Sequence, residues 1–206
     1  MDIKKFKKLP VIGILRDIEV DYLEPLIEAI CESGLKTIEI TMNTKKAIKL
    51  IEKAVKFSRN RLIIGAGTVL DVENFKPALD AGATFCVMPV FVKRVTEYCL
   101  KNKIPVFPGA LTPLEVYSAW QAGATMVKVF PAKLFGPDYF KEIKGPFKDI
   151  ELLACGGITP QNIKAYFSNG ASAVAFGASV FKKEWLESKD FPIIRDSIKD
   201  FIGNLS

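Results

Sequence analysis

A lysine stands in a segment that is otherwise apolar. Lys128 lies within Thr125–Phe130, with a valine on each side. If this segment is a strand, alternation places Lys128 on the face opposite to those valines. A lysine that loses its hydration has a lowered pKa unless an anion restores the charge, and its neutral amine attacks carbonyl carbons. Lys128 is therefore a candidate for covalent catalysis. The alternatives are a structural ion pair and an amine that reaches solvent at the rim.

Glu39 has a similar setting within Thr37–Thr41. A buried carboxylate needs a partner or is protonated with a raised pKa. If Lys128 also points inward the two could pair, and Glu39 becomes the candidate general acid or base. A purely structural ion pair is the alternative. The chain has no histidine, which excludes Ser-His-Asp triads, Cys-His pairs and histidine metal ligands.

Two further groups could bind a substrate, one through a positive charge and one through the protein backbone. Arg16 follows the apolar segment Val11–Leu15, and its guanidinium could hold a carboxylate or phosphate, pair with Glu39, or lie on the surface. Gly67 and Thr68 follow another apolar segment, where small residues let a ligand approach the backbone. Because no complete Gly-x-Gly-x-x-Gly motif occurs, a dinucleotide site is not expected.

Repeated helix-to-strand turns must position these residues. Four times a helical pattern ends in glycine and a short β-branched segment follows, and glycine adopts the left-handed conformation there at little cost. Helical patterns cover about 20–33, 45–57, 71–81, 91–101, 112–121, 136–144, 159–168 and 190–204. The expected strands are Pro10–Leu15, Thr37–Thr41, Leu62–Ala66, Thr84–Met88, Pro105–Phe107, Thr125–Phe130, Glu151–Cys155 and Ala173–Phe176.

These strands are nearly all apolar, which is typical of a parallel sheet covered on both faces. Eight such units predict an α/β fold, a closed (β/α)8 or TIM barrel, as one domain over residues 1–206. A doubly wound open sheet is the second choice. In a barrel, the loops after the last two strands often bind phosphate. Gly156, Gly157, Gly177 and Ser179 occupy those loops, with ordinary tight turns as the alternative.

Composition limits the partners. The net charge is +6, but the lysines are dispersed among acidic residues. Nucleic acid is therefore not expected as a partner, and an anionic small substrate suits the charge equally well. No apolar run approaches the ~18 residues of a membrane span, and no signal-type core follows the N-terminus, so a cytoplasmic protein is expected. Four scattered cysteines predict buried thiols rather than disulfides or a zinc site.

A set of motifs, in order along residues 8–202, resembles 2-keto-3-deoxy-6-phosphogluconate aldolase and its relative acting on 6-phosphogalactonate. The lysine segment and the Gly-Ala-Gly-Thr segment are the most specific of them. The motifs are Ile38–Thr41, Ile64–Val69, Pro108-Gly109 with Thr112–Glu115, Val127–Ala132, Gly145–Phe147 and Gly156–Ile158.

The resemblance implies a class I aldolase that cleaves a phosphorylated keto-deoxy sugar acid into pyruvate and glyceraldehyde 3-phosphate. Lys128 matches the Schiff-base lysine, and Glu39 matches the acid/base that acts through a water. The other matched positions are Gly67 and Thr68 for the substrate carboxylate, Pro89 and Phe130 for the pocket wall, and Gly156, Gly157 and Ser179 for the phosphate. The family is typically a homotrimer, and neither a metal nor another cofactor is expected.

Some positions depart from the family pattern. Asn43 stands where many phosphogluconate members have arginine, which looks more like the galactonate branch; Cys155 replaces a common threonine, and Lys133 a frequent glutamate. The configuration of the substrate therefore stays open, as does activity on hydroxy-keto-glutarate. Two other functions also remain: a phosphate-binding barrel isomerase or synthase without a covalent step, and a barrel that binds a phosphorylated metabolite without turnover.

Overall fold

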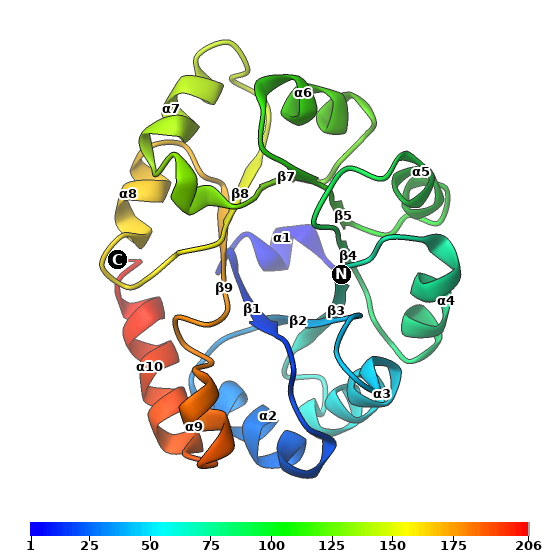
Figure 1. Ribbon diagram of the computed structural model, residues 1–206, viewed down its shortest axis with the longest axis vertical. Coiled ribbons are helices and arrows are strands. Elements are labelled where there is room, and N and C mark those ends of the chain that lie inside the picture. Colours follow the sequence, from blue (N-terminus) through cyan, green and yellow to red (C-terminus); the bar gives the residue numbers. More distant parts are fainter. Residues whose placement is uncertain (206) are drawn as a thin grey trace.

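The computed structural model describes residues 1–205, and its strands form one parallel sheet (Figure 1). Their order is β5-β4-β3-β2-β1-β9-β8-β7-β6. The strands are β1 (Val11–Leu15), β2 (Thr37–Thr41), β3 (Ile63–Gly67), β4 (Cys86–Val87), β5 (Val106–Phe107), β6 (Gly109–Ala110), β7 (Val127–Val129), β8 (Leu152–Cys155) and β9 (Ala173–Phe176).

The two strands at the ends of this order belong to one stretch of chain. Only Pro108 separates β5 from β6. The Val106 carbonyl accepts a hydrogen bond from the Thr125 N–H (2.9 Å), and the Pro108 carbonyl accepts one from the Lys128 N–H (2.8 Å). The stretch therefore pairs with β4 on one side and with β7 on the other, which closes the ring. This confirms the predicted (β/α)8 barrel.

Helices surround the ring, and each predicted helical pattern forms one (Figure 1). They are η1 (Val20–Tyr22), α2 (Leu23–Glu32), α3 (Ala47–Ser58), α4 (Val72–Asp80), α5 (Lys93–Lys101), α6 (Pro113–Gln121), η2 (Ala132–Leu134), α7 (Asp138–Lys144), α8 (Ile163–Ser168) and α10 (Phe191–Gly203). Three short helices lie outside the predicted ranges: α1 (Ile3–Phe6), η2 and α9 (Lys183–Glu187).

Helix starts agree with the sequence signals in one case and differ in another. At α6 the Thr112 hydroxyl accepts from the Glu115 N–H, and the Glu115 carboxylate accepts from the Thr112 N–H, which forms a capping box where the predicted helix begins. Helix α8 begins at Ile163 rather than at the predicted residue 159, because the Asn162 side chain accepts from the Thr159 N–H and closes a turn before the helix.

The barrel interior is closed at its amino end. In the view of Figure 1, helix α1 covers the opening of the ring, and Phe6 is buried against Phe107 at 6.2 Å between ring centroids. Phe107 in turn packs edge-on against Phe85. A Cβ added to Gly65 would lie 2.4 Å from the Phe85 ring, so this part of the interior is filled. Space for a ligand is left at the carboxyl ends of the strands.

The helices and the cysteines bear on the predictions made from composition. Across residues 1–205, the helices are all too short or too polar to span a bilayer. Cys86, Cys99 and Cys155 are buried thiols, as expected, whereas Cys31 is half-buried.

Candidate active site

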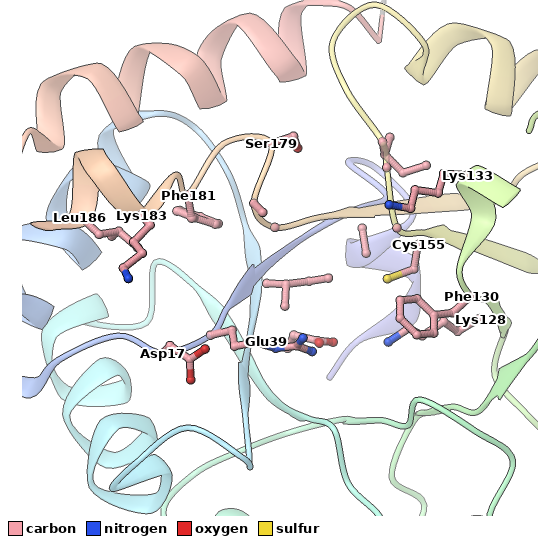
Figure 2. A pocket seen from close by; sticks show the side chains of 18 of the residues that line it. Asp17, Glu39, Lys128, Phe130, Lys133, Cys155, Ser179, Phe181, Lys183 and Leu186 are labelled. Atoms are coloured by element: carbon pink, nitrogen blue, oxygen red, sulfur yellow. The ribbon is translucent and has the colours of Figure 1, made fainter.

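A cavity of about 890 Å³ opens at the carboxyl ends of β7, β8, β9, β1 and β2. Figure 2 shows side chains from these different strands directed into it. Most of the predicted site residues line this cavity: Arg16, Glu39, Lys128, Phe130, Gly156, Gly157, Gly177 and Ser179. The chain therefore brings together residues that lie more than 160 positions apart, from Arg16 to Ser179.

Lys128 lies in the middle of β7 and is only 6% exposed. Its Nζ is 5.1 Å from the centroid of the Phe130 ring, a cation–π contact. Neither Lys128 nor Glu39 takes part in an ion pair within residues 1–205. The structural ion pair considered from the sequence does not form as a direct contact, which leaves the Lys128 amine available to a ligand.

Glu39 lies in β2 and is 2% exposed. Burial raises the pKa of its carboxyl above the usual value, and the positive charges of Lys128 and Arg16 offset part of that rise. Its Oε2 is buried and has no hydrogen-bond partner among the described residues. A carboxyl group in this setting can hold a proton and release it to a neighbour, as general acid–base catalysis requires.

Gly67 does not line the cavity but makes room for Glu39. A Cβ added to Gly67 would lie 2.4 Å from Glu39 Oε1 and 2.6 Å from its Cδ. Glu39 and Thr41 pair in register with Gly65 and Gly67 of β3, so the carboxyl extends across the face of the next strand. Any larger residue at 67 would displace the carboxyl group.

The turns after β8 and β9 form the other end of the cavity. Gly156 and Gly157 both have positive φ, 95° and 84°, which side-chain-bearing residues rarely adopt. Ser179 Oγ is buried and has no hydrogen-bond partner within residues 1–205. An unpaired buried hydroxyl costs about 1–3 kcal/mol, so a ligand that accepted its hydrogen bond would remove that cost.

Four predicted site residues lie outside the cavity. Asn43 is exposed in the turn after β2, Thr68 follows β3 with a positive φ of 56°, and Pro89 follows β4 with its carbonyl against Gly109. Gly67, Thr68 and Pro89 lie at the ends of β3 and β4, on the side of the ring where Phe85 packs against Gly65 and Phe107. Because Asn43 lies outside the cavity, its position does not indicate the substrate configuration.

Several cavity residues were not predicted as site residues. Lys133 and Cys155 stood out in the sequence only as departures from a pattern. Asp17, Tyr22, Lys183 and Glu187 carried no signal, because they lie in the β1–η1 loop, in η1 and in the unpredicted helix α9. Burial raises the pKa of the Cys155 thiol and the Lys128 charge opposes this, so the group beside the amine is a neutral thiol.

The sequence model of one protein family, described as "Aldolase: KDPG and KHG aldolase", matches residues 3–196. A 2-dehydro-3-deoxy-6-phosphogalactonate aldolase of Escherichia coli is 32% identical over 176 residues, which cover 85% of this chain and 86% of that protein. A 2-dehydro-3-deoxy-phosphogluconate aldolase of Pseudomonas aeruginosa is 37% identical over 161 residues, covering 78% of this chain and 71% of that one.

A solved structure agrees with both. It is a KDPG aldolase of Legionella pneumophila with pyruvate captured as a covalent carbinolamine intermediate. It superimposes with a TM-score of 0.87 at 28% identity and covers 94% of each chain.

Proposed function

Because this chain belongs to the KDPG and KHG aldolase family, we propose that it is a class I aldolase. It cleaves 2-keto-3-deoxy-6-phosphogluconate, or the 6-phosphogalactonate epimer, into pyruvate and glyceraldehyde 3-phosphate. The observation that carries the proposal is a buried lysine, Lys128, that has no acidic partner among residues 1–205 and shares one cavity with Glu39, a buried carboxyl whose pKa is raised. A phosphorylated substrate does not cross membranes unaided, which is the reason to propose a cytoplasmic enzyme.

The chemistry begins at Lys128. Its neutral amine adds to the C2 ketone and forms a carbinolamine, and loss of water gives an iminium ion. The carbinolamine oxygen must be protonated to leave, and the Glu39 carboxyl is the nearby acid of suitable pKa. Glu39, now ionised, accepts the C4 hydroxyl proton directly or through a water.

Bond cleavage follows from this proton transfer. The C3–C4 bond breaks, its electron pair flows into the iminium to give an enamine, and the aldehyde leaves. Protonation of the enamine at C3 and hydrolysis of the imine then release pyruvate and restore the Lys128 amine. Lys128 and Glu39 together supply every proton transfer, so a histidine is not needed.

The remaining cavity residues bind the substrate in this proposal. The phosphate lies against Gly156, Gly157 and the loop Gly177–Ser179, where Ser179 Oγ donates the hydrogen bond it otherwise lacks. Arg16 lines the same cavity, near enough to Glu39 for its charge to lower the pKa of that carboxyl, and it pairs with an anionic or hydroxyl group of the substrate. Phe130 packs over Lys128 and keeps water from the amine.

Borohydride reduction with pyruvate tests the covalent step. We expect a reduced pyruvate adduct on the peptide that contains Lys128, located by peptide mass mapping, and no adduct in a folded Lys128→Ala variant. Cleavage by that variant at the wild-type rate would contradict the mechanism. Lys128→Arg separates this proposal from a non-covalent isomerase or synthase, since only the non-covalent enzyme would keep substantial activity.

We also propose that the enzyme is a homotrimer. Large apolar side chains are exposed on one side of the molecule, around α6 and η2: Leu114 is 74% exposed, Leu134 60% and Phe135 57%. The Tyr139 hydroxyl donates to the Leu111 carbonyl and ties α7 to the start of α6, and Tyr117 of α6 stacks on Phe147 at 5.5 Å. Exposed apolar groups on such a firmly held surface support its burial against another subunit.

A further inference from the structure

Lys133 has no part in the chemistry proposed above, although it lines the same cavity. It lies in η2, just beyond the strand that carries Lys128. Figure 2 shows its amine directed toward the interior of the cavity. A cation in this place needs an explanation, because the fold itself does not use its charge.

The base of the Lys133 side chain is fixed above the glycine pair. Its backbone N–H donates to the Gly156 carbonyl at 3.0 Å. A Cβ added to Gly157 would lie 2.6 Å from Lys133 Cβ and 3.2 Å from its Cδ, so the aliphatic stem runs along the Gly157 backbone. The ammonium group of Lys133 therefore lies near the turn after β8, at the end of the cavity proposed to bind the phosphate.

Charge is distributed unevenly around the cavity. Its acidic residues are Asp17, Glu19, Glu39 and Glu187, and they come from the β1–η1 loop, β2 and α9. None follows β7 or β8. Within residues 1–205, Lys133 forms no ion pair, whereas the other peripheral lysine of the cavity, Lys183, pairs with Glu187 at 3.6 Å.

We propose that Lys133 determines specificity for a substrate whose far end is a phosphate dianion. Gly156, Gly157 and Ser179 offer only neutral groups, which would accept a hydroxyl or a phosphate alike. An unpaired ammonium group beside them stabilises a doubly charged end group selectively, because its attraction grows with the charge of the ligand. This inference rests on the proposed aldolase function and adds a residue to it.

The test compares Lys133→Met with wild type on the phosphorylated acid and on the same acid without its phosphate. Methionine keeps the stem that packs on Gly157 and removes only the charge. We expect kcat/KM for the phosphorylated acid to fall about 10- to 100-fold, mainly through KM. The kcat/KM for the unphosphorylated acid should change little. Inhibition by inorganic phosphate should weaken by a factor similar to the fall in kcat/KM for the phosphorylated acid.

Controls separate charge from structure. Lys133→Arg should keep most of the preference, and Lys141→Met removes an equal charge from an exposed site on α7 outside the cavity and should change neither substrate. Pyruvate trapping on Lys128 and the thermal unfolding temperature should be unchanged in Lys133→Met, which shows that the variant is folded.

Two failures are distinguishable. If wild-type enzyme cleaves the phosphorylated acid but Lys133→Met loses activity toward both acids equally, or toward neither, only the role of Lys133 is wrong. If wild-type enzyme cleaves neither acid and traps no pyruvate, the aldolase function is wrong and the inference falls with it.

Discussion

At the scale of single residues, Glu39 links stability to pH. Burial raises the pKa of its carboxyl in the folded state, so on raising the pH the unfolded chain loses its proton first. Stability is therefore fully present below the unfolded pKa of about 4.3 and declines as pH rises from there through the higher folded pKa. Glu39→Gln removes this loss. We expect the difference in stability between Glu39→Gln and wild type, measured by thermal unfolding, to favour the variant more at pH 8 than at pH 4. Its kcat should fall about 10²- to 10⁴-fold. An equal stability difference at both pH values would contradict the raised pKa.

Gly67 sets the position of that carboxyl. Gly67→Ala would place a Cβ 2.4 Å from Glu39 Oε1, and the carboxyl must move because the β3 backbone cannot. We expect at least a 10-fold fall in kcat, since a displacement of about 1 Å in a catalytic group has large effects, together with a loss of about 1–3 kcal/mol of stability. Gly203→Ala is the matched control, because nothing lies within 4 Å of its added Cβ. Unchanged steady-state kinetics in Gly67→Ala would show that Glu39 is not held there.

At the scale of elements, much of the fold follows from the sequence because its signals are local. Glycine follows four of the helices and a short apolar strand marks every βα unit, and the charged residues within those strands, Glu39 and Lys128, are the ones that enter the cavity. Helices α1 and α9 escape prediction because four or five residues carry no periodicity. Thus Phe6, which closes the barrel, and the wall formed by Lys183 and Glu187 could not be foreseen.

The candidate site was also predictable in part, where its residues follow strands that the sequence marks. Position at the carboxyl end of a strand can be read from the sequence, which places Gly156 and Ser179 correctly at the open end of the barrel. Which part of that end stays hollow depends on how interior side chains pack. Phe85 packs against Gly65 and Phe107, in the strands next to Thr68 and Pro89, and no pattern along the chain reveals such packing between distant strands.

At the scale of the whole molecule, the apolar surface around α6 should decide the assembly. Leu114 is 74% exposed, so Leu114→Glu should change the stability of an isolated subunit by no more than about 0.5 kcal/mol. In a subunit interface the same carboxylate would be desolvated without a partner, which costs several kcal/mol. We expect light scattering after size-exclusion chromatography to give about three times the 22.8 kDa chain mass for wild type and a single chain mass for the variant. Ile193→Glu, on α10 away from this surface, is the matched control and should remain trimeric. A monomeric wild type would overturn the trimer itself, whereas a trimeric Leu114→Glu would show only that subunits meet through another face.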